Sequence, residues 1–222
     1  MKKGVNMIHQ NTRIGKNTKI GMYSVIGYRG NEGKCVEIGQ DCVIGNHVTI
    51  YPSTKIGSNV FIKDYSCIEE NACIGNNVFI DNYSYIGRDV IIDDHALILY
   101  GAKIYGGAKV GRYSRIGGFV AENTTIRDYV TVFGKLIHSF RDPTHWGGGE
   151  EPPTIDNFVV VGFNAVVIGG IKVSHHVYIA AGAVVSKDVP PYSMAYGVNK
   201  ITPLKAWRGK MKKSKFWRWE EK

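Results

Sequence analysis

Hydrophobic residues recur at every sixth position along roughly half of the chain. Isoleucine or valine occupies 17 of the 18 six-step positions from Ile14 to Ile116, and Glu32 is the exception. A small or thin residue stands four positions after each of these aliphatic residues, and glycine directly follows ten of them. Neither the helical period of about 3.6 residues nor the strand period of about 2 produces this spacing. The pattern therefore predicts neither a long helix nor a plain alternating strand.

Six residues with one inward aliphatic side chain, one inward small side chain and a glycine-competent bend form a short strand and a corner. Three such units close a triangular coil, and successive coils stack at the inter-strand spacing of about 4.8 Å. Stacked coils pair their backbone groups as parallel sheets around a continuous aliphatic ladder. We therefore predict an all-β parallel β-helix of about eight to nine coils, with residues 1–201 as one β-helix domain. The repeat itself does not determine the handedness.

The six-residue register is interrupted in the second half of the chain. It breaks after Ile116, and its last run begins at Ile155. The stretch between them contains "HSFRDPTHWGGGEEPP", which has two histidines, a tryptophan and three glycines in a row. We predict that residues 133–154 form a loop that protrudes from the coil near its C-terminal end. Loops on rigid scaffolds often carry the chemistry of a protein.

The residues after the last coil, 202–222, form a basic and aromatic tail. Thr202 is placed as a helix N-cap and Pro203 as the first helical residue, so a short helix is expected. We interpret the tail as a cap on the open strand edges at the end of the prism. Its mixture of lysine, arginine and tryptophan also fits an anionic membrane surface, which is the weaker alternative, and no nucleic-acid partner is expected.

The composition limits the classes of protein to which the chain can belong. Of its 222 residues, 44% are hydrophobic and 21% are charged, which is typical of a globular domain. No signal peptide or membrane-spanning run is recognisable, so a cytoplasmic location is expected. The net charge of +9 favours anionic ligands. The four cysteines contain no CxxC pair, so we expect reduced thiols and no zinc framework.

The C-terminal part of the repeat carries a recognisable signature. The stretch "VVVGFNAVVIGGIKVSHHVYIAAGAVVSKDVPPYSMAYGVNK" resembles the last coils of hexapeptide-repeat acyltransferases, with the greatest similarity to sugar and xenobiotic O- or N-acetyltransferases. In that family a run such as "SKDVPP" closes the last coil, and the turn that follows here, "YGVNK", departs from the usual G-N-P type. The resemblance implies a left-handed prism, a homotrimer, and acetyl-CoA as the donor in the cleft between neighbouring prisms.

The resemblance also implies which residues contact acetyl-CoA. Backbone groups of the last coils would lie against the pantetheine arm, and polar or basic residues would lie near the adenosine phosphates. The first group is Phe163, Ala165 and Ala181, and the second group is Ser186, Lys187 and Arg208. Lysine and arginine are the side chains that meet phosphate oxygens, which agrees with this assignment.

Acyl transfer from a thioester needs a base that takes the proton of the attacking hydroxyl or amine. Histidine suits this role because its ordinary pKa of about 6.5 lies near neutral pH. His138 follows the segment "VTVFGKLI", and in the resembling transferases the catalytic histidine follows a similar strand and opens the loop. We therefore assign His138 as the general base and His145 as the second candidate. No motif for a nucleophilic serine or cysteine is evident, so the acceptor is expected to attack directly.

The same loop supplies candidates for the acceptor site. Asp142 and Trp146 are assigned to acceptor binding, and the indole either stacks on a sugar ring or anchors the loop. Asp142, Glu150 and Glu151 can each orient the imidazole, and the sequence does not select among them. We expect a small acceptor such as a sugar or nucleotide sugar. Transfer to oxygen or to nitrogen, and transfer of acetyl or of a longer acyl group, are left open by the sequence.

Two other functions share features with this sequence. A zinc hydratase, the gamma-class carbonic anhydrase, uses the same prism, but its histidine pair spaced five residues apart is missing, since His138 and His145 are seven apart. Four histidines of the repeat are interpreted as solvent-exposed corner residues, namely His47, His95, His175 and His176. We therefore expect no metal. A non-catalytic scaffold is the main alternative, because a fold does not imply a function. The histidine loop and the "SKDVPP" run favour the transferase.

Overall fold

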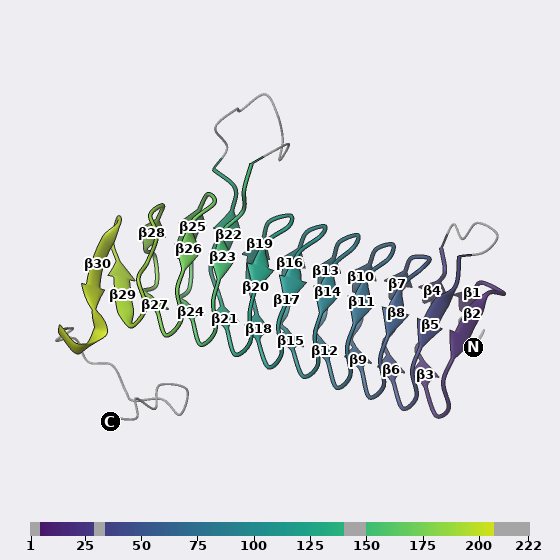
Figure 1. Cartoon of the computed structure of the whole chain (residues 1–222). Helices are drawn as coiled ribbons and strands as arrows, with labels where there is room; N and C mark the ends of the chain where they lie inside the picture. The colour runs from purple at the N-terminus through teal and green to yellow at the C-terminus, as the bar shows by residue number, and fades with distance from the viewer. Residues whose placement is uncertain (1–4, 29–33, 140–149, 207–222) are drawn as a thin grey trace.

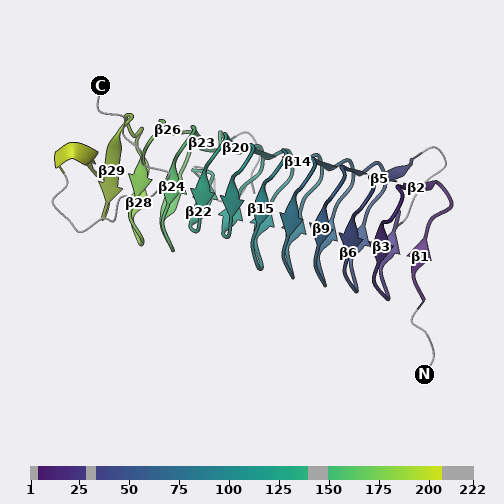
Figure 2. The same ribbon diagram turned by 90° about the horizontal axis from the view of Figure 1, so that it is seen from below.

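The computed structural model describes residues 5–28, 34–139 and 150–206. Within them the chain winds into a β-solenoid of about ten turns (Figures 1 and 2). Each turn contributes short strands to three sheets, and the pairing between successive turns is parallel. This arrangement confirms the predicted all-β solenoid. It has slightly more turns than predicted, because a first turn begins before Ile14 and residues 117–137 continue the coil.

The three sheets are named A, B and C in the order in which the chain visits them, and the corners between them are the A–B, B–C and C–A corners. Sheet A contains β1 (Met7–Ile8), β4 (Val25–Ile26), β7 (Thr49–Ile50), β10 (Cys67–Ile68), β13 (Tyr85–Ile86), β16 (Lys103–Ile104), β19 (Phe119–Val120), β22 (Lys135–Ile137), β25 (Val166–Ile168) and β28 (Val184–Val185). Sheet B contains β2 (Thr12–Ile14), β5 (Val36–Ile38), β8 (Lys55–Ile56), β11 (Cys73–Ile74), β14 (Ile91–Ile92), β17 (Lys109–Val110), β20 (Thr125–Ile126), β23 (Thr154–Ile155) and β26 (Lys172–Val173). Sheet C contains β3 (Lys19–Ile20), β6 (Val43–Ile44), β9 (Phe61–Ile62), β12 (Phe79–Ile80), β15 (Leu97–Ile98), β18 (Arg115–Ile116), β21 (Thr131–Val132), β24 (Val160–Val161), β27 (Tyr178–Ile179), β29 (Ser193–Tyr196) and β30 (Lys200–Pro203).

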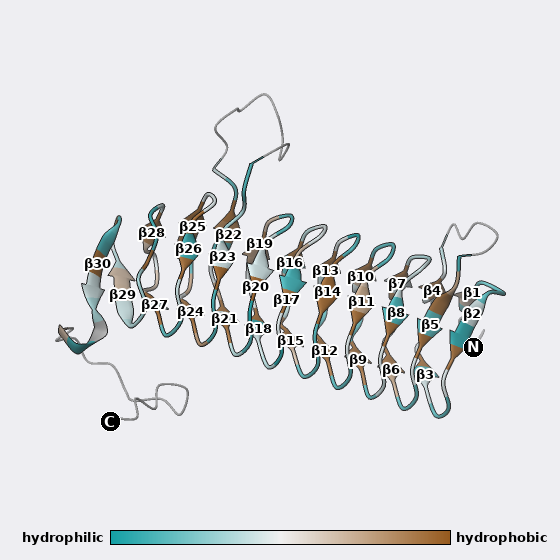
Figure 3. Cartoon of the chain, in the orientation of Figure 1, coloured by the Kyte–Doolittle hydropathy of each residue, from teal (hydrophilic) through white to brown (hydrophobic). Residues whose placement is uncertain are grey.

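The core is a ladder of the aliphatic side chains of the repeat. From Ile26 to Ile116 each repeat isoleucine or valine points inward and is at most 4% exposed. Ile14 is 39% exposed because β2 is the outermost strand of sheet B in the described residues. Figure 3 shows hydrophobic segments recurring on the strands and hydrophilic segments at many corners. Burial of one such side chain stabilises the fold by about 1.5–3 kcal/mol, so the ladder is the main source of stability.

Most corners are made by a residue in the left-handed backbone conformation. Asn59, Tyr65 and His95 have φ angles of 57°, 61° and 62°, respectively. Residues other than glycine seldom adopt positive φ, so the stacked coils impose this conformation on the corners. Asparagine and aspartate tolerate it best, which explains why they are frequent in the polar half of the repeat.

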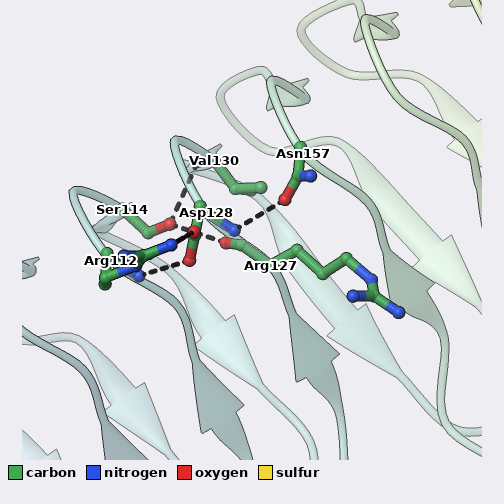
Figure 4. A network of polar contacts seen from close by, with 6 residues as sticks. All are labelled: Arg112, Ser114, Arg127, Asp128, Val130 and Asn157. Carbon is green, nitrogen blue, oxygen red and sulfur yellow. Dashed lines mark hydrogen bonds and ion pairs between the residues drawn. The ribbon is translucent and has the colours of Figure 1, made fainter.

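Side-chain hydrogen bonds link the corners of successive turns. At the B–C corner, Oδ1 of Asp128 accepts the Arg112 backbone N–H at 2.8 Å, and Oδ2 accepts Nε and Nη2 of the same arginine at 3.1 and 2.7 Å (Figure 4). The backbone N–H of Asp128 donates in turn to Oδ1 of Asn157 at 3.0 Å. These bonds satisfy backbone groups of the corners that the sheets do not pair.

Aromatic rings stack along two of the corners. The C–A ladder, on the N-terminal turns, has ring centroids 4.8–5.1 Å apart and interplanar angles of 3–15°, and it contains Tyr23, His47, Tyr65 and Tyr83. The B–C ladder, on the C-terminal turns, has centroids 4.7–5.1 Å apart and angles of 2–30°, and it contains His95, Tyr113, Tyr129, Phe158, His176 and Tyr192. The spacing equals the rise per coil of about 4.8 Å, so the solenoid itself brings these rings face to face.

The ladders change the interpretation of the corner histidines. His47 and His95 are exposed as predicted, but each of them stacks on a tyrosine. The predicted exposure of His175 and His176 is wrong, since both are half-buried and their Nδ1 atoms lie 3.0 Å apart. His176 is covered because Phe158 and Tyr192 of the neighbouring turns stack on its two faces. His175 packs edge-on against Tyr192.

Two C–A corners are two residues shorter than the others. β18 is joined to β19 by two glycines, and β21 is joined to β22 by Phe133 and Gly134. A side chain on Gly118 would collide with the carbonyl of Gly134 in the next turn, so only glycine fits there. The predicted break after Ile116 is therefore a shortened corner, and Val120 continues the buried ladder there. After the second shortened corner Leu136 continues it, in place of the six-step position His138.

The C-terminal end of the solenoid is closed by an antiparallel hairpin, in which β29 pairs with β30. The predicted start of a helix at Thr202 and Pro203 is wrong, because both residues lie in β30. Proline lacks a backbone donor and is tolerated in an edge strand such as β30. In the described part of the chain the helical structure is limited to the 3-10 turn η1 (Leu204–Ala206), and no helix there is long and apolar enough to cross a membrane. Residues 207–222, with the rest of the predicted helical tail, lie outside the described residues.

Candidate functional site

The chain leaves the solenoid at the A–B corner between β22 and β23 (Figure 1). This excursion corresponds to the loop predicted at residues 133–154. It is shorter than predicted, because Lys135–Ile137 belongs to sheet A and Thr154 belongs to sheet B. The described base of the excursion therefore consists of the segment that follows β22 and the segment that returns to β23.

Several assigned residues fall on the part of the excursion between these two segments. Residues 140–149 lie outside the described residues. They include the second candidate base and both residues assigned to the acceptor, namely His145, Asp142 and Trp146. The geometry of the site is therefore built on His138 and the coils around it.

His138 is buried at the start of the excursion, with 4% of its surface exposed. Its Nε2 lies 2.9 Å from the backbone carbonyl oxygen of Glu122, on the A–B corner of the preceding turn. A carbonyl oxygen only accepts, so Nε2 carries the hydrogen in the neutral ring and Nδ1 is the basic nitrogen. The backbone of a rigid coil therefore sets both the tautomer and the orientation of the imidazole.

Two glycines of the following turn let the excursion pass close to the coil. Gly169 has a φ angle of +85°, and a methyl group there would lie 3.4 Å from Cβ of Ser139. A methyl group on Gly170 would lie 2.6 Å from Cβ of Glu151. The start and the return of the excursion thus pack against one glycine bend, the A–B corner after β25.

A cavity of about 250 Å³ lies where the excursion returns to sheet B. Its charged lining residues are Arg127, Glu151, Asp156 and Lys172. Nε of Arg127 is 3.7 Å from Oδ1 of Asp156. Two cations and two carboxylates in a small cavity suit a ligand that carries both charges. Of the four residues only Glu151 could be named from the sequence, because the others occupy repeat positions that look like ordinary solvated corners or strand faces.

The residues assigned to the pantetheine arm lie on the C–A corner of the last turns. Phe163 is 64% exposed, and its ring stacks on Phe133 at a centroid distance of 4.5 Å. Ala181 is exposed one turn later. Ala165 is buried, and its backbone N–H and C=O are both hydrogen-bonded within the solenoid. Phe163 and Ala181 are therefore the members of this group that a ligand can reach.

The residues assigned to the adenosine phosphates lie on another edge. Ser186 and Lys187 are exposed on the A–B corner after β28, where the Ser186 N–H donates to Oδ1 of Asn199 at 2.8 Å. Arg208 lies outside the described residues. Ser186 and Lys187 thus lie on the same edge of sheet A as His138. The residues assigned to the pantetheine arm lie on the opposite edge of this sheet. Within one chain, the described members of these groups therefore lie on two different edges of sheet A.

The half-buried histidine pair lies apart from this site, on the B–C corner. Burial, and then the nearby charge of His175, lower the pKa of His176. Among the described residues no group of three or more histidine, cysteine, aspartate or glutamate side chains is placed to hold a metal ion. The four cysteines are free thiols.

The repeat matches a known family model. The model described as "Bacterial transferase hexapeptide (six repeats)" matches residues 35–70, 53–88 and 71–104. A serine acetyltransferase of Helicobacter pylori (strain J99) is 38% identical over 114 residues, which cover 50% of this chain and 65% of that protein. A serine acetyltransferase of Mycobacterium tuberculosis is 33% identical over 105 residues, which cover 46% of this chain and 44% of that protein. The chain thus spans less than two thirds of these relatives.

Solved structures show the same fold at low sequence identity. LpxA from Acinetobacter baumannii superposes with a TM-score of 0.58 at 21% identity, over 91% of this chain and 76% of that chain. UDP-N-acetylglucosamine acyltransferase from Campylobacter jejuni superposes with a TM-score of 0.58 at 20% identity, over 89% of this chain and 71% of that chain. At these identities the likeness establishes the fold alone.

Proposed function

Because this chain carries the hexapeptide repeat of bacterial transferases and is related over half of its length to acetyltransferases, we propose that it transfers an acetyl group from acetyl-CoA to a hydroxyl or an amine. His138 is the general base in this proposal. The observation that carries it is the buried imidazole at the base of the excursion, held through Nε2 by the carbonyl of Glu122. That bond leaves Nδ1 as the nitrogen that accepts a proton.

In the proposed reaction the acceptor attacks acetyl-CoA directly. As the acceptor oxygen or nitrogen bonds to the thioester carbonyl carbon, Nδ1 of His138 takes the acceptor proton. The tetrahedral intermediate then collapses, the C–S bond breaks, and the imidazolium returns the proton to the sulfur of CoA. The hydrogen bond from Nε2 to the Glu122 carbonyl stabilises the imidazolium during this cycle.

We place the donor in a cleft between two copies of the chain, within a homotrimer. The separation of the assigned residues supports this placement, since the residues assigned to the pantetheine arm and His138 lie on opposite edges of sheet A. A neighbouring copy that presents its C–A corner to the A–B corner of the first copy brings the two groups together. No metal takes part in the proposed reaction.

The acceptor proposed first is the hydroxyl or amine of a sugar, as in the acetyltransferases that the C-terminal signature resembles. A second acceptor is supported by the cavity beside the excursion. Its two cations and two carboxylates suit an amino acid, which carries an ammonium and a carboxylate at neutral pH. The relatives named serine acetyltransferases favour serine. Arg127 and Lys172 would then bind the carboxylate, and Glu151 and Asp156 the ammonium group.

Release of CoA thiol from acetyl-CoA tests the proposal, with serine, glucosamine and UDP-N-acetylglucosamine as acceptors. His138→Ala is expected to lower kcat about 10²–10⁴-fold, which is the usual contribution of a general base. His138→Gln keeps a donor for the Glu122 carbonyl, so it separates the loss of the base from a loss of structure. His95→Ala is the matched control, because His95 stacks on the B–C ladder away from the A–B corner. Unchanged kcat in folded His138→Gln protein would rule out His138 as the base.

A further inference from the structure

The outer face of sheet A carries a row of side chains that alternate in chemistry. Tyr85 in β13, Lys103 in β16, Phe119 in β19 and Lys135 in β22 are direct partners in the parallel register. Each of them precedes a buried ladder residue, so its side chain points away from the core. Along the solenoid axis toward the turn of His138 the row therefore reads aromatic, cation, aromatic, cation.

Tyr105, two residues after Lys103, lies between the two aromatic members of this row. Its ring centroid is 5.4 Å from that of Tyr85 and 4.9 Å from that of Phe119, at interplanar angles of 53° and 40°. In the C–A ladder the angles are only 3–15°, so each ring there covers the face of the next. The tilted rings on sheet A leave part of their faces uncovered by one another, and such faces stack on nucleobases.

Glu69 stands at the end of this surface farthest from His138. Its side chain forms a hydrogen bond with the phenol of Tyr85, and burial together with this bond raises the pKa of Tyr85. Tyr85 therefore stays protonated and donates to the carboxylate, which keeps further lone pairs for other donors. A carboxylate beside an aromatic face is suited to accept hydrogen bonds from the hydroxyls of a ribose.

The two lysines of the row are available to a charged ligand. Lys103 and Lys135 are both exposed, and neither forms an ion pair with a described residue. By contrast, Lys63 on another corner is paired with Asp81 at 3.2 Å. Two ammonium groups on either side of Phe119 complement the two charges of a diphosphate.

The order and the length of this surface match one class of ligand. The turn of Tyr85 and the turn of His138 are three coils apart in sheet A. At about 4.8 Å per coil this separation is about 14 Å, on the order of an extended nucleoside diphosphate. A base on the tilted rings and a diphosphate on the lysines would direct an attached sugar toward His138.

We infer that this surface binds the nucleoside diphosphate part of a nucleotide-sugar acceptor. We call it the sheet A platform, and its members are Glu69, Tyr85, Lys103, Tyr105, Phe119 and Lys135. The inference rests on the proposed function, because an acyl acceptor is the ligand that needs its sugar at His138. It also gives a role to the middle turns of the solenoid, from β10 to β19, which the transfer chemistry itself does not require.

Two other ligands could occupy the sheet A platform in place of an acceptor, namely a second copy of the chain and acetyl-CoA. A second copy of the chain would bury Lys103 and Lys135, and each buried ammonium group would need a carboxylate opposite it. Acetyl-CoA contains an adenosine diphosphate group, so the donor is another source of the same chemistry. Competition with CoA and the oligomeric state of the variants distinguish these occupants.

Isothermal titration calorimetry on the full chain, without acetyl-CoA, tests the platform with UDP, GDP and UDP-N-acetylglucosamine. At least one of them is expected to bind. The double variant Lys103→Ala/Lys135→Ala is expected to raise the Kd at least about tenfold, and Tyr105→Ala about tenfold, since a stacked base contributes about 1–3 kcal/mol. Lys109→Ala is the matched control, because Lys109 is an exposed lysine on the outer face of sheet B. Its Kd is expected to equal that of the wild type.

Each other outcome overturns the inference. If none of the three nucleotides binds, or if the Kd is unchanged in the lysine double variant, the sheet A platform is not a nucleotide-binding site. Competition by CoA at the lysine-dependent site assigns it to the donor. A changed oligomeric state of the double variant in analytical ultracentrifugation assigns the face to a second copy.

The same experiment separates this inference from the proposed function. His138→Gln is expected to bind the nucleotide with the wild-type Kd while losing acetyl transfer. Lysine-dependent nucleotide binding without transfer to any acceptor would count against the acetyltransferase alone. Transfer to serine without nucleotide binding would count against the platform alone.

Discussion

The three edges of the solenoid come from one repeat, but they carry different side chains. The B–C and C–A corners hold stacked rings and carboxylates that bond to the next turn. The A–B corner holds His138 and the two longest connections of the solenoid, after β4 and after β22. On the first two edges the rings stack face to face, whereas carboxylates link successive turns on the A–B edge as well, where Asp89 accepts a hydrogen bond from Nδ2 of Asn71. The difference indicates that the repeat provides a rigid frame everywhere, and that the longest connections leave this frame on the edge whose described rings form no face-to-face ladder.

Separating two turns is expected to have the largest effect on stability. Gly118→Ala puts a methyl group against the Gly134 carbonyl, and the free energy of unfolding should fall by about 2–3 kcal/mol. Gly101→Ala is the matched control, because Gly101 has a φ of +67° but nothing within 4 Å of the added methyl group. Backbone strain alone should cost about 1 kcal/mol there. Urea unfolding measures both, and equal losses would contradict a collision between turns.

Breaking the corner network of Figure 4 is expected to have an intermediate effect. Asp128→Ala removes the acceptor of three hydrogen bonds from Arg112. The Arg112 side chain is 62% exposed, so solvent screens the charges, and the loss of unfolding free energy should be smaller than that of Gly118→Ala. Asp128→Asn keeps an acceptor for the backbone N–H and should lose less. Activity per folded molecule should stay at the wild-type value, and a fall in kcat/KM would show that this edge takes part in the chemistry.

Removing one ladder ring is expected to have a smaller effect. Tyr129→Ala deletes the stacking on Tyr113 and Phe158 and should lower the unfolding free energy by about 1 kcal/mol. Tyr129 has a φ of 58°, and asparagine accepts positive φ more readily than alanine. Tyr129→Asn should therefore be more stable than Tyr129→Ala in thermal unfolding. If the two variants have the same Tm, the corner conformation does not contribute.

The smallest expected effect is a pH dependence of the B–C ladder. Partial burial, and then the charge of His175, lower the pKa of His176 in the folded state. Below the unfolded-state pKa of about 6.5 the unfolded chain binds more protons than the folded chain. Stability from this group is therefore complete above about pH 6.5 and declines as the pH falls through the folded-state pKa. Urea unfolding between pH 7.5 and 5 measures how the free energy of unfolding depends on pH. This free energy should fall less steeply with falling pH in His176→Gln than in the wild type, and an identical pH dependence would rule out His176 as its origin.

The six-residue period was sufficient to predict the fold and most of the core. A buried aliphatic at each strand is a local requirement, so Ile26 and Ile104 could be placed without knowing their neighbours. The shortened corners could not be predicted, because removal of two residues shifts the ladder to Leu136 only if the next turn accepts it. The hairpin was mistaken for a helix because Thr202 and Pro203 satisfy the local rules for both structures.

The geometry of the candidate site could be predicted less completely than the fold. His138 follows directly from its place after a strand, but its hydrogen bond to Glu122 depends on the stacking of two turns. The aromatic ladders had a signal that could have been found, since His47, Tyr65 and Tyr83 stand 18 residues apart. The cavity as a whole left no recognisable pattern in the sequence, because its charged residues come from three different turns and from the returning excursion.

Among the described residues the first turn of the solenoid is more exposed than the last, which favours opening of the solenoid from that turn. In a stacked array each turn contacts only its neighbours, so fraying proceeds from an uncovered end and moves one turn at a time. Ile8 is 43% exposed at the N-terminal end, whereas Val189, in the last turn, is 1% exposed. β22 lies seven turns beyond β1 in sheet A. The N-terminal turns therefore act as a buffer, and hydrogen exchange should slow progressively along them while the imidazole of His138 keeps its place.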